Sequence, residues 1–168
     1  TGNDPRVVRY TPIIHTMTAA FVSIAQCGQS GSAVIAAGLI PATLEMMDQK
    51  VMRSLEEFAH PGLPVAAGAM LIVEVDGYPA SLDSQISEIA NILRQNGAHD
   101  LRIAQTEQER ETLWFGRKSA GGAYPHYTVD STVPRSRIAE TLDVANRICE
   151  EHGVRVGHVF HAGDGNLH

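Results

Sequence analysis

The last ten residues, VFHAGDGNLH, contain side chains that could bind a cation. His161 and His168 flank a glycine-rich segment that carries Asp164 and Asn166. Asp-Gly is the dipeptide most typical of a two-residue hairpin turn, because both positions tolerate positive φ. With a turn at Asp164 and Gly165, His161 would pair with His168, and directly opposed residues point to the same face of a sheet. Two imidazoles placed in this way can converge on one divalent ion.

Two histidines alone do not make a catalytic metal site, which usually has three protein ligands and an open position. His158 is a candidate third ligand, but positions 158 and 161 of a strand face opposite sides. We therefore expect His158 to be packed or on the surface. We interpret Asp164 as a turn residue rather than a base.

Length and composition predict one globular domain over residues 1–168. Hydrophobic residues make up 43% of the chain and charged residues 19%, with a net charge of −6 and no basic run, which argues against nucleic-acid binding. The longest apolar run has about ten residues, whereas a membrane span needs about twenty. Cys27 and Cys149 are the only cysteines, which favours reduced thiols and a cytoplasmic location.

Periodicity predicts strands that alternate with helices. Strands are expected at 16–25, 67–77, 100–105, 126–133 and 155–161, and helices at 30–39, 42–59, 81–97, from 106 onward and 134–153. Pro134 and Gly153 bound the last helix. This order is compatible with a parallel α/β sheet or an α+β layer fold. Neither a dinucleotide-binding GxGxxG turn nor a phosphate loop follows a predicted strand.

Several segments, in order along the chain, resemble one family. They are GLIPATLEMMD (38–48), LIVEVDG (71–77), WFGRKSA (114–120), VDSTVPRSRI (129–138) and the terminal HAGDGNLH. Together they resemble the FAD-linked oxidase C-terminal domain of the glycolate oxidase GlcD, D-lactate dehydrogenase and D-2-hydroxyglutarate dehydrogenase type, and among these the GlcD type most. The resemblance covers about residues 11–168.

The resemblance implies an α+β fold of ferredoxin-like architecture, an antiparallel sheet flanked by helices, which acts as a cap. It implies a chain that is incomplete at its C-terminus and separated from the N-terminal domain that carries most of the FAD site. The whole enzyme would oxidise a D-2-hydroxy acid such as glycolate or D-lactate to the 2-oxo acid. Other oxidase subunits are conceivable partners, and the location would be cytoplasmic or peripheral at the inner face of the membrane.

The resemblance also assigns roles to residues. Arg117 would bind the substrate carboxylate, and His161 and His168 would bind a divalent metal, Zn²⁺ or Mn²⁺, together with a Glu beyond residue 168. Asn166 would orient the turn or approach the flavin. Lys118 is expected to be solvated. The loop at 121–128 is shorter than in GlcD-type relatives; Tyr124, His126 and Tyr127 could face a substrate there.

Two functions of different classes follow. The chain is either the cap portion of a flavin-dependent 2-hydroxy-acid dehydrogenase or a non-catalytic binding or assembly module of a multi-subunit oxidase. In either case we expect the isolated chain to bind no flavin and to show no turnover.

Overall fold

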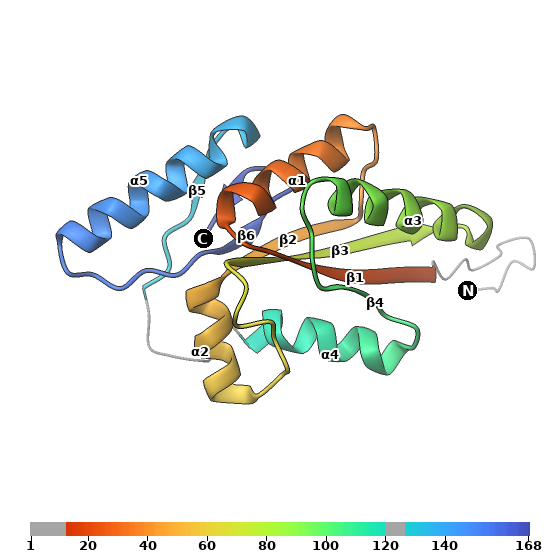
Figure 1. Ribbon diagram of the computed structural model, residues 1–168, viewed down its shortest axis with the longest axis horizontal. Coiled ribbons are helices and arrows are strands. Elements are labelled where there is room, and N and C mark those ends of the chain that lie inside the picture. The colour runs from red at the N-terminus through yellow and green to blue at the C-terminus, as the bar shows by residue number, and fades with distance from the viewer. Residues whose placement is uncertain (1–12, 120–126) are drawn as a thin grey trace, which may run out of the picture.

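The structure is a computed structural model that describes residues 13–119 and 127–168 (Figure 1). Within these residues it forms one antiparallel sheet of seven strands in the order β4-β1-β3-β2-β6-β7-β5. The strands are β1 (Ile13–Phe21), β2 (Thr43–Asp48), β3 (Ala69–Gly77), β4 (Leu101–Ile103), β5 (Ser131–Thr132), β6 (Val159–His161) and β7 (Asn166–Leu167). The helices are α1 (Ile24–Ala36), α2 (Gln49–Ala59), α3 (Pro79–Gln95), α4 (Glu107–Lys118) and α5 (Ile138–Glu151), with a 3-10 turn η2 (Arg135–Arg137) before α5.

The first four strands form a ferredoxin-like core. Helix α1 connects β1 to β2 and helix α3 connects β3 to β4, while β3 and β1 occupy the two central positions of the order β4-β1-β3-β2. This is the split β-α-β arrangement. The predicted α+β, ferredoxin-like fold with an antiparallel sheet is therefore confirmed, and the parallel alternative is wrong. Strands β6, β7 and β5 extend the sheet beyond β2.

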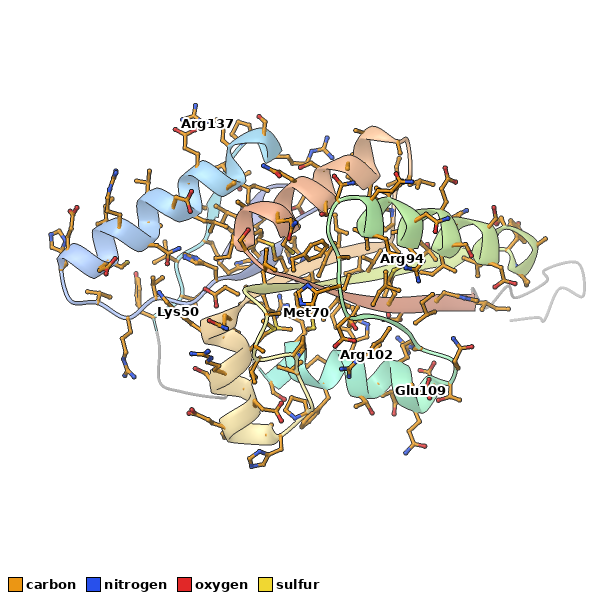
Figure 2. All side chains as sticks on the ribbon, in the orientation of Figure 1. Lys50, Met70, Arg94, Arg102, Glu109 and Arg137 are labelled. Carbon is orange, nitrogen blue, oxygen red and sulfur yellow. The ribbon has the colours of Figure 1, made fainter. Side chains whose placement is uncertain are left out.

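Helices cover both faces of the sheet (Figure 1). Helices α1, α3 and α5 lie on one face and α2 and α4 on the other. Side chains fill the space between sheet and helices on both sides, and the labelled Met70 of β3 lies at the sheet (Figure 2). No helix among the described residues is long and apolar enough to cross a membrane.

The two faces of the sheet differ in chemistry. The face under α1, α3 and α5 packs a large apolar core that includes Met17, Leu71 and Phe160. The other face packs a smaller core around Met47 and Met70. A continuous row of laterally paired residues crosses this second face: Arg102, Thr18, Ile72, Glu45, His161, Asn166 and Thr132. Because directly opposed residues share a face, the polar members of the row gather on one side.

The predicted helix at 42–59 is wrong in its first third. Residues 43–48 form β2, hydrogen-bonded between β3 and β6, and the helix begins only at Gln49. Leu44 and Met46 face one core and Met47 faces the other, so pairing within the sheet overrides the helix propensity of Leu, Glu and Met. Asp48 then caps α2, because its side chain accepts the Val51 N–H at 2.8 Å.

Other predicted boundaries shift as well. Helix α1 spans 24–36 instead of 30–39, because Ser23 is its cap and accepts the Gln26 N–H at 3.2 Å. Strand β1 lies at 13–21, not 16–25: it ends before the Ser23 cap, and it begins earlier because Ile13 pairs with Gly77 of β3. Strand β6 keeps only residues 159–161 of the predicted 155–161. Of the strand predicted at 126–133, residue 126 lies outside the described residues, and β5 is formed by residues 131–132 of the remainder. Helices α3 and α5 confirm the predictions at 81–97 and 134–153 to within a turn.

Candidate functional site

The loop between β6 and β7 places the two terminal histidines, but not by the predicted turn. His161 pairs with Asn166, so the loop has four residues, 162–165, and His161 does not pair with His168. The Asp164 carboxylate accepts the Asn166 N–H at 2.9 Å, which satisfies Asp164 locally and widens the turn. Gly165 has a φ of +87°, and its carbonyl accepts the Val133 N–H at 3.0 Å. Asp164 is thus a turn residue, as predicted.

The two imidazoles nevertheless lie side by side. His168 is two residues beyond Asn166, so it is a diagonal neighbour of His161 on the same face of the sheet. The ring centroids are 5.4 Å apart and the planes cross at 78°. The His161 side chain is 44% exposed and that of His168 21% exposed, so solutes can reach both rings.

Each imidazole contacts a carboxylate through the same ring nitrogen. Nδ1 of His161 contacts Oε1 of Glu45, and Nδ1 of His168 is hydrogen-bonded to Oδ1 of Asp130. Glu45 lies opposite His161 on β2, and its side chain is only 3% exposed. Asp130 precedes β5, and its side chain is 70% exposed. With Nδ1 engaged on both rings, Nε2 is the nitrogen of each that is left for another partner.

Arg117 reaches the same carboxylate from α4. Its Nε donates to Oε2 of Glu45 at 3.0 Å, so the Glu45 carboxylate bridges Arg117 and His161. Among the described residues, the two terminal guanidinium nitrogens have no hydrogen-bond partner. One turn and two turns earlier on α4, Trp114 and Arg110 donate to Glu74 of β3. Arg110, Trp114 and Arg117 thus lie along one side of α4, three or four residues apart. Their hydrogen bonds to Glu74 and Glu45 fix α4 on the sheet.

The sequence patterns alone did not point to Glu45 or Asp130 as members of the site. Glu45 fell within the predicted helix, where its side chain had no assigned direction. An acidic residue inside the apolar run LEMM was the available signal, because a buried carboxylate needs a partner. Asp130 is the Asp of the D-x-x-x-P-R pattern in VDSTVPRSRI, one of the segments that carry the family resemblance, but it was assigned no role.

His158 belongs to the opposite side of the strand, as predicted from its position. It is 6% exposed, its Nε2 lies 3.2 Å from the Asn146 side-chain oxygen on α5, and its backbone N–H donates to Asp48. Burial lowers the pKa of His158, and the charge of Asp48 opposes this shift. Burial raises the pKa of Asp48, although the Val51 and His158 N–H groups and the charge of His158 oppose it.

Of the remaining predicted residues, the structure describes Lys118, Asn166 and Tyr127. Lys118 is exposed at the end of α4, as expected. Asn166 lies opposite His161 in the lateral row. Tyr127 is 91% exposed, and Tyr124 and His126 lie outside the described residues.

The paired imidazoles of His161 and His168 could bind a metal ion, although they are only two ligands. No group of three or more His, Cys, Asp or Glu side chains that could hold an ion occurs among residues 13–119 and 127–168. Metal-binding histidines almost always engage a carboxylate, carbonyl or water through their second nitrogen. His161 and His168 both do so, and therefore the residues present fit two of the ligands of a divalent ion.

Comparison with known proteins agrees with this fold. The family model of FAD linked oxidases, C-terminal domain, matches residues 13–168. The glycolate oxidase subunit GlcD of Escherichia coli K12 is 40% identical over 162 residues, which cover 94% of this chain and 32% of that protein. GlcD of Bacillus subtilis is 37% identical over 158 residues (91% and 34%), and a D-lactate dehydrogenase of Anaerostipes hadrus is 30% identical over 142 residues (77% and 30%). The chain thus spans about a third of the length of these relatives.

A solved structure gives the same result for the fold. The crystal structure of p-cresol methylhydroxylase with substrate bound superposes with a TM-score of 0.67 at 12% identity, over 94% of this chain and 38% of that one. The likeness extends to the architecture and not to individual side chains. From the match of the family model over residues 13–168 and the GlcD relatives, the chain belongs to the family of FAD linked oxidases, C-terminal domain.

Proposed function

We propose that this chain is the substrate-binding and metal-binding cap portion of an FAD-dependent oxidoreductase that converts a D-2-hydroxy acid, of the glycolate or D-lactate type, to the 2-oxo acid. The family and the names of the relatives support the class of reaction. The observation that carries the proposal is that Arg117 and His161 share the Glu45 carboxylate, while the ring of His168 lies beside that of His161 on the same face of the sheet.

Arg117 is the proposed carboxylate-binding residue. Its Nε is held by Glu45, while the edge formed by its two terminal nitrogens is open to another anion. A guanidinium can bind a carboxylate through two parallel hydrogen bonds, and this fixes the α-carbon of the substrate relative to the rest of the site. Because the Arg117 side chain is only 21% exposed, such a contact would be poorly screened by solvent.

His161 and His168 are the proposed ligands of Zn²⁺ or Mn²⁺, each through Nε2. A divalent ion there would polarise the hydroxyl oxygen of the substrate and favour its deprotonation. The exposure of the two rings leaves room for ligands from elsewhere in the protein. FAD, bound mainly by a separate N-terminal domain, would supply the acceptor for the hydride.

Asn166 is the proposed flavin-side residue, because it lies next to His161 in the lateral row and on the same face. Its alternative role is to orient the turn, which is supported by the hydrogen bond from its backbone N–H to Asp164. A cytoplasmic location, or a peripheral one at the inner face of the membrane, stays a prediction that rests on the free thiols of Cys27 and Cys149. Other oxidase subunits are proposed partners only by analogy with GlcD.

The test is oxidation of glycolate and D-lactate by the complete protein, with an artificial electron acceptor. We expect turnover of at least one acid, a higher KM for Arg117→Lys, and loss of bound metal for His161→Ala and His168→Ala. The 168 residues alone should be colourless and inactive. A complete protein that binds no FAD and oxidises no 2-hydroxy acid would favour the alternative, a non-catalytic binding or assembly module.

A further inference from the structure

The Glu45 carboxylate is shared between two side chains of different proposed roles. Oε2 accepts the Arg117 Nε–H at 3.0 Å, and Oε1 contacts Nδ1 of His161. Glu45 is itself held rigidly, since it lies on β2 between β3 and β6 and its side chain is 3% exposed. A buried strand residue therefore fixes both a helix side chain and a side chain near the loop.

Glu74 provides an internal comparison on the same face of the sheet. It is also a buried glutamate on a central strand, and it also binds an arginine of α4, Arg110 at 3.3 Å. Its other partners are Thr16, which donates at 2.6 Å, and Trp114. None of these three lies in the proposed site, and through them Glu74 joins α4 and β1 to β3.

We propose that Glu45 is a positioning residue that sets both the metal-facing nitrogen of His161 and the substrate-facing edge of Arg117. Asp130 has the corresponding role for His168 alone. The inference rests on the proposed function, which it deepens by naming the side chains that hold the ligands in place.

The chemistry of the two partners explains why one carboxylate can serve both. A carboxylate accepts but does not donate, so it selects the imidazole tautomer that carries its proton on Nδ1 and leaves the Nε2 lone pair for a metal ion. The same carboxylate takes the Nε–H of the guanidinium and so leaves the parallel N–H groups of the opposite edge for a substrate carboxylate. Loss of such partners typically lowers metal affinity 10–100-fold.

The experiment compares Glu45→Gln, Asp130→Asn and Glu74→Gln. In the metal-free 168-residue chain, ¹⁵N NMR of the imidazoles reports the tautomer of each histidine. In the complete protein, Zn²⁺ competition against a chelator reports metal affinity, and steady-state kinetics report KM for the 2-hydroxy acid.

We expect Glu45→Gln to disturb the Nδ1–H tautomer of His161, to weaken Zn²⁺ binding about 10–100-fold and to raise KM about tenfold. Asp130→Asn should change the tautomer of His168 and the affinity for Zn²⁺. At saturating Zn²⁺ it should leave KM for the 2-hydroxy acid unchanged. Glu74→Gln should lower thermal stability and leave both tautomers and the metal affinity unchanged. If Glu45→Gln does not fold, Glu45→Asp, which keeps the charge but shortens the side chain by one methylene, takes its place.

The inference is overturned if the Glu45 variant leaves the His161 tautomer, metal affinity and KM as in the wild type, or if Glu74→Gln gives the same changes. Failure of the proposed function looks different. In that case the wild-type complete protein neither retains Zn²⁺ nor oxidises a 2-hydroxy acid, while the NMR measurement still decides whether Glu45 fixes the His161 tautomer.

Discussion

The two faces of the sheet bury polar groups in opposite ways. On the face under α2 and α4, Glu45 and Glu74 are buried against arginines of α4, so each charge has an opposite charge beside it. On the face under α1, α3 and α5 the core is apolar, and the polar pair near its border, Asp48 and His158, is shifted by burial toward the neutral forms. A sheet of this kind can hold a charged site on the face where a helix supplies the counter-charges, while the other face supplies the apolar core.

The largest effect in this comparison should come from the apolar face. Phe160 is fully buried and lies next to His161 in sequence, but it points to the opposite core. Phe160→Ala should lower the free energy of unfolding by about 3–5 kcal/mol, because it leaves a cavity. Denaturant unfolding measures this. A loss below about 1 kcal/mol would mean that the apolar face is not the main source of stability.

An intermediate effect is expected at the loop that positions the histidines. A Cβ at Gly165 would lie 2.1 Å from the Val133 carbonyl oxygen, and φ there is +87°. A residue held in a disfavoured backbone conformation typically lowers the free energy of unfolding by about 1–3 kcal/mol. Gly165→Ala should lower it by more than this, because the backbone must also move.

Gly38 is the matched control for this variant. Its φ is +81°, but nothing lies within 4 Å of a Cβ placed there. Gly38→Ala should therefore cost only the conformational term and leave the chemical shifts of His161 and His168 unchanged, whereas Gly165→Ala should shift both. Equal stability losses and equal shifts for the two variants would contradict the close approach of Gly165 to Val133.

The smallest effect is a dependence of stability on pH from the Asp48–His158 pair. The pKa of His158 lies below its ordinary value of 6.5 in the folded chain, so the unfolded chain binds more protons just below pH 6.5. Stability due to His158 should therefore fall as pH drops below about 6.5. The pKa of Asp48 lies above its ordinary 3.8, so the folded chain binds more protons above that value, and stability due to Asp48 falls as pH rises through this window.

The variant His158→Gln isolates the histidine contribution. Thermal melts should be recorded between about pH 5 and pH 7.5, a range that brackets the ordinary pKa of histidine. The variant should lose less stability toward acid pH than the wild type does. The backbone N–H at residue 158 can still donate to Asp48, so the Asp48 contribution should persist. A steeper acid loss in the variant would show that His158 is not buried in its neutral form.

The sequence was most informative where one signal acts alone. The apolar run of β3 and the amphipathic pattern of α3 depend on local features, and both elements lie within two residues of their predicted bounds. Helix α3 nevertheless begins at Pro79 without a side-chain cap. Residues 43–48 were assigned to a helix because Leu44, Met47 and Val51 recur at helical spacing, and only the pairing of this segment with β3 and β6 makes it a strand.

The candidate site shows the same limit. The proximity of His161 and His168 was predictable from their spacing, but their register was not, because Asp164 bonds to the Asn166 N–H and widens the turn. The meeting of Glu45, Arg117 and His161 joins three elements that are distant in the chain, and no local pattern encodes it.

The most direct test of the proposed metal site is anomalous diffraction from crystals of the complete protein grown with Zn²⁺. We expect a single strong peak about 2.0–2.1 Å from Nε2 of both His161 and His168, with Nδ1 of each ring still hydrogen-bonded to its carboxylate. A peak bound through Nδ1, or one that involves neither ring, would contradict it.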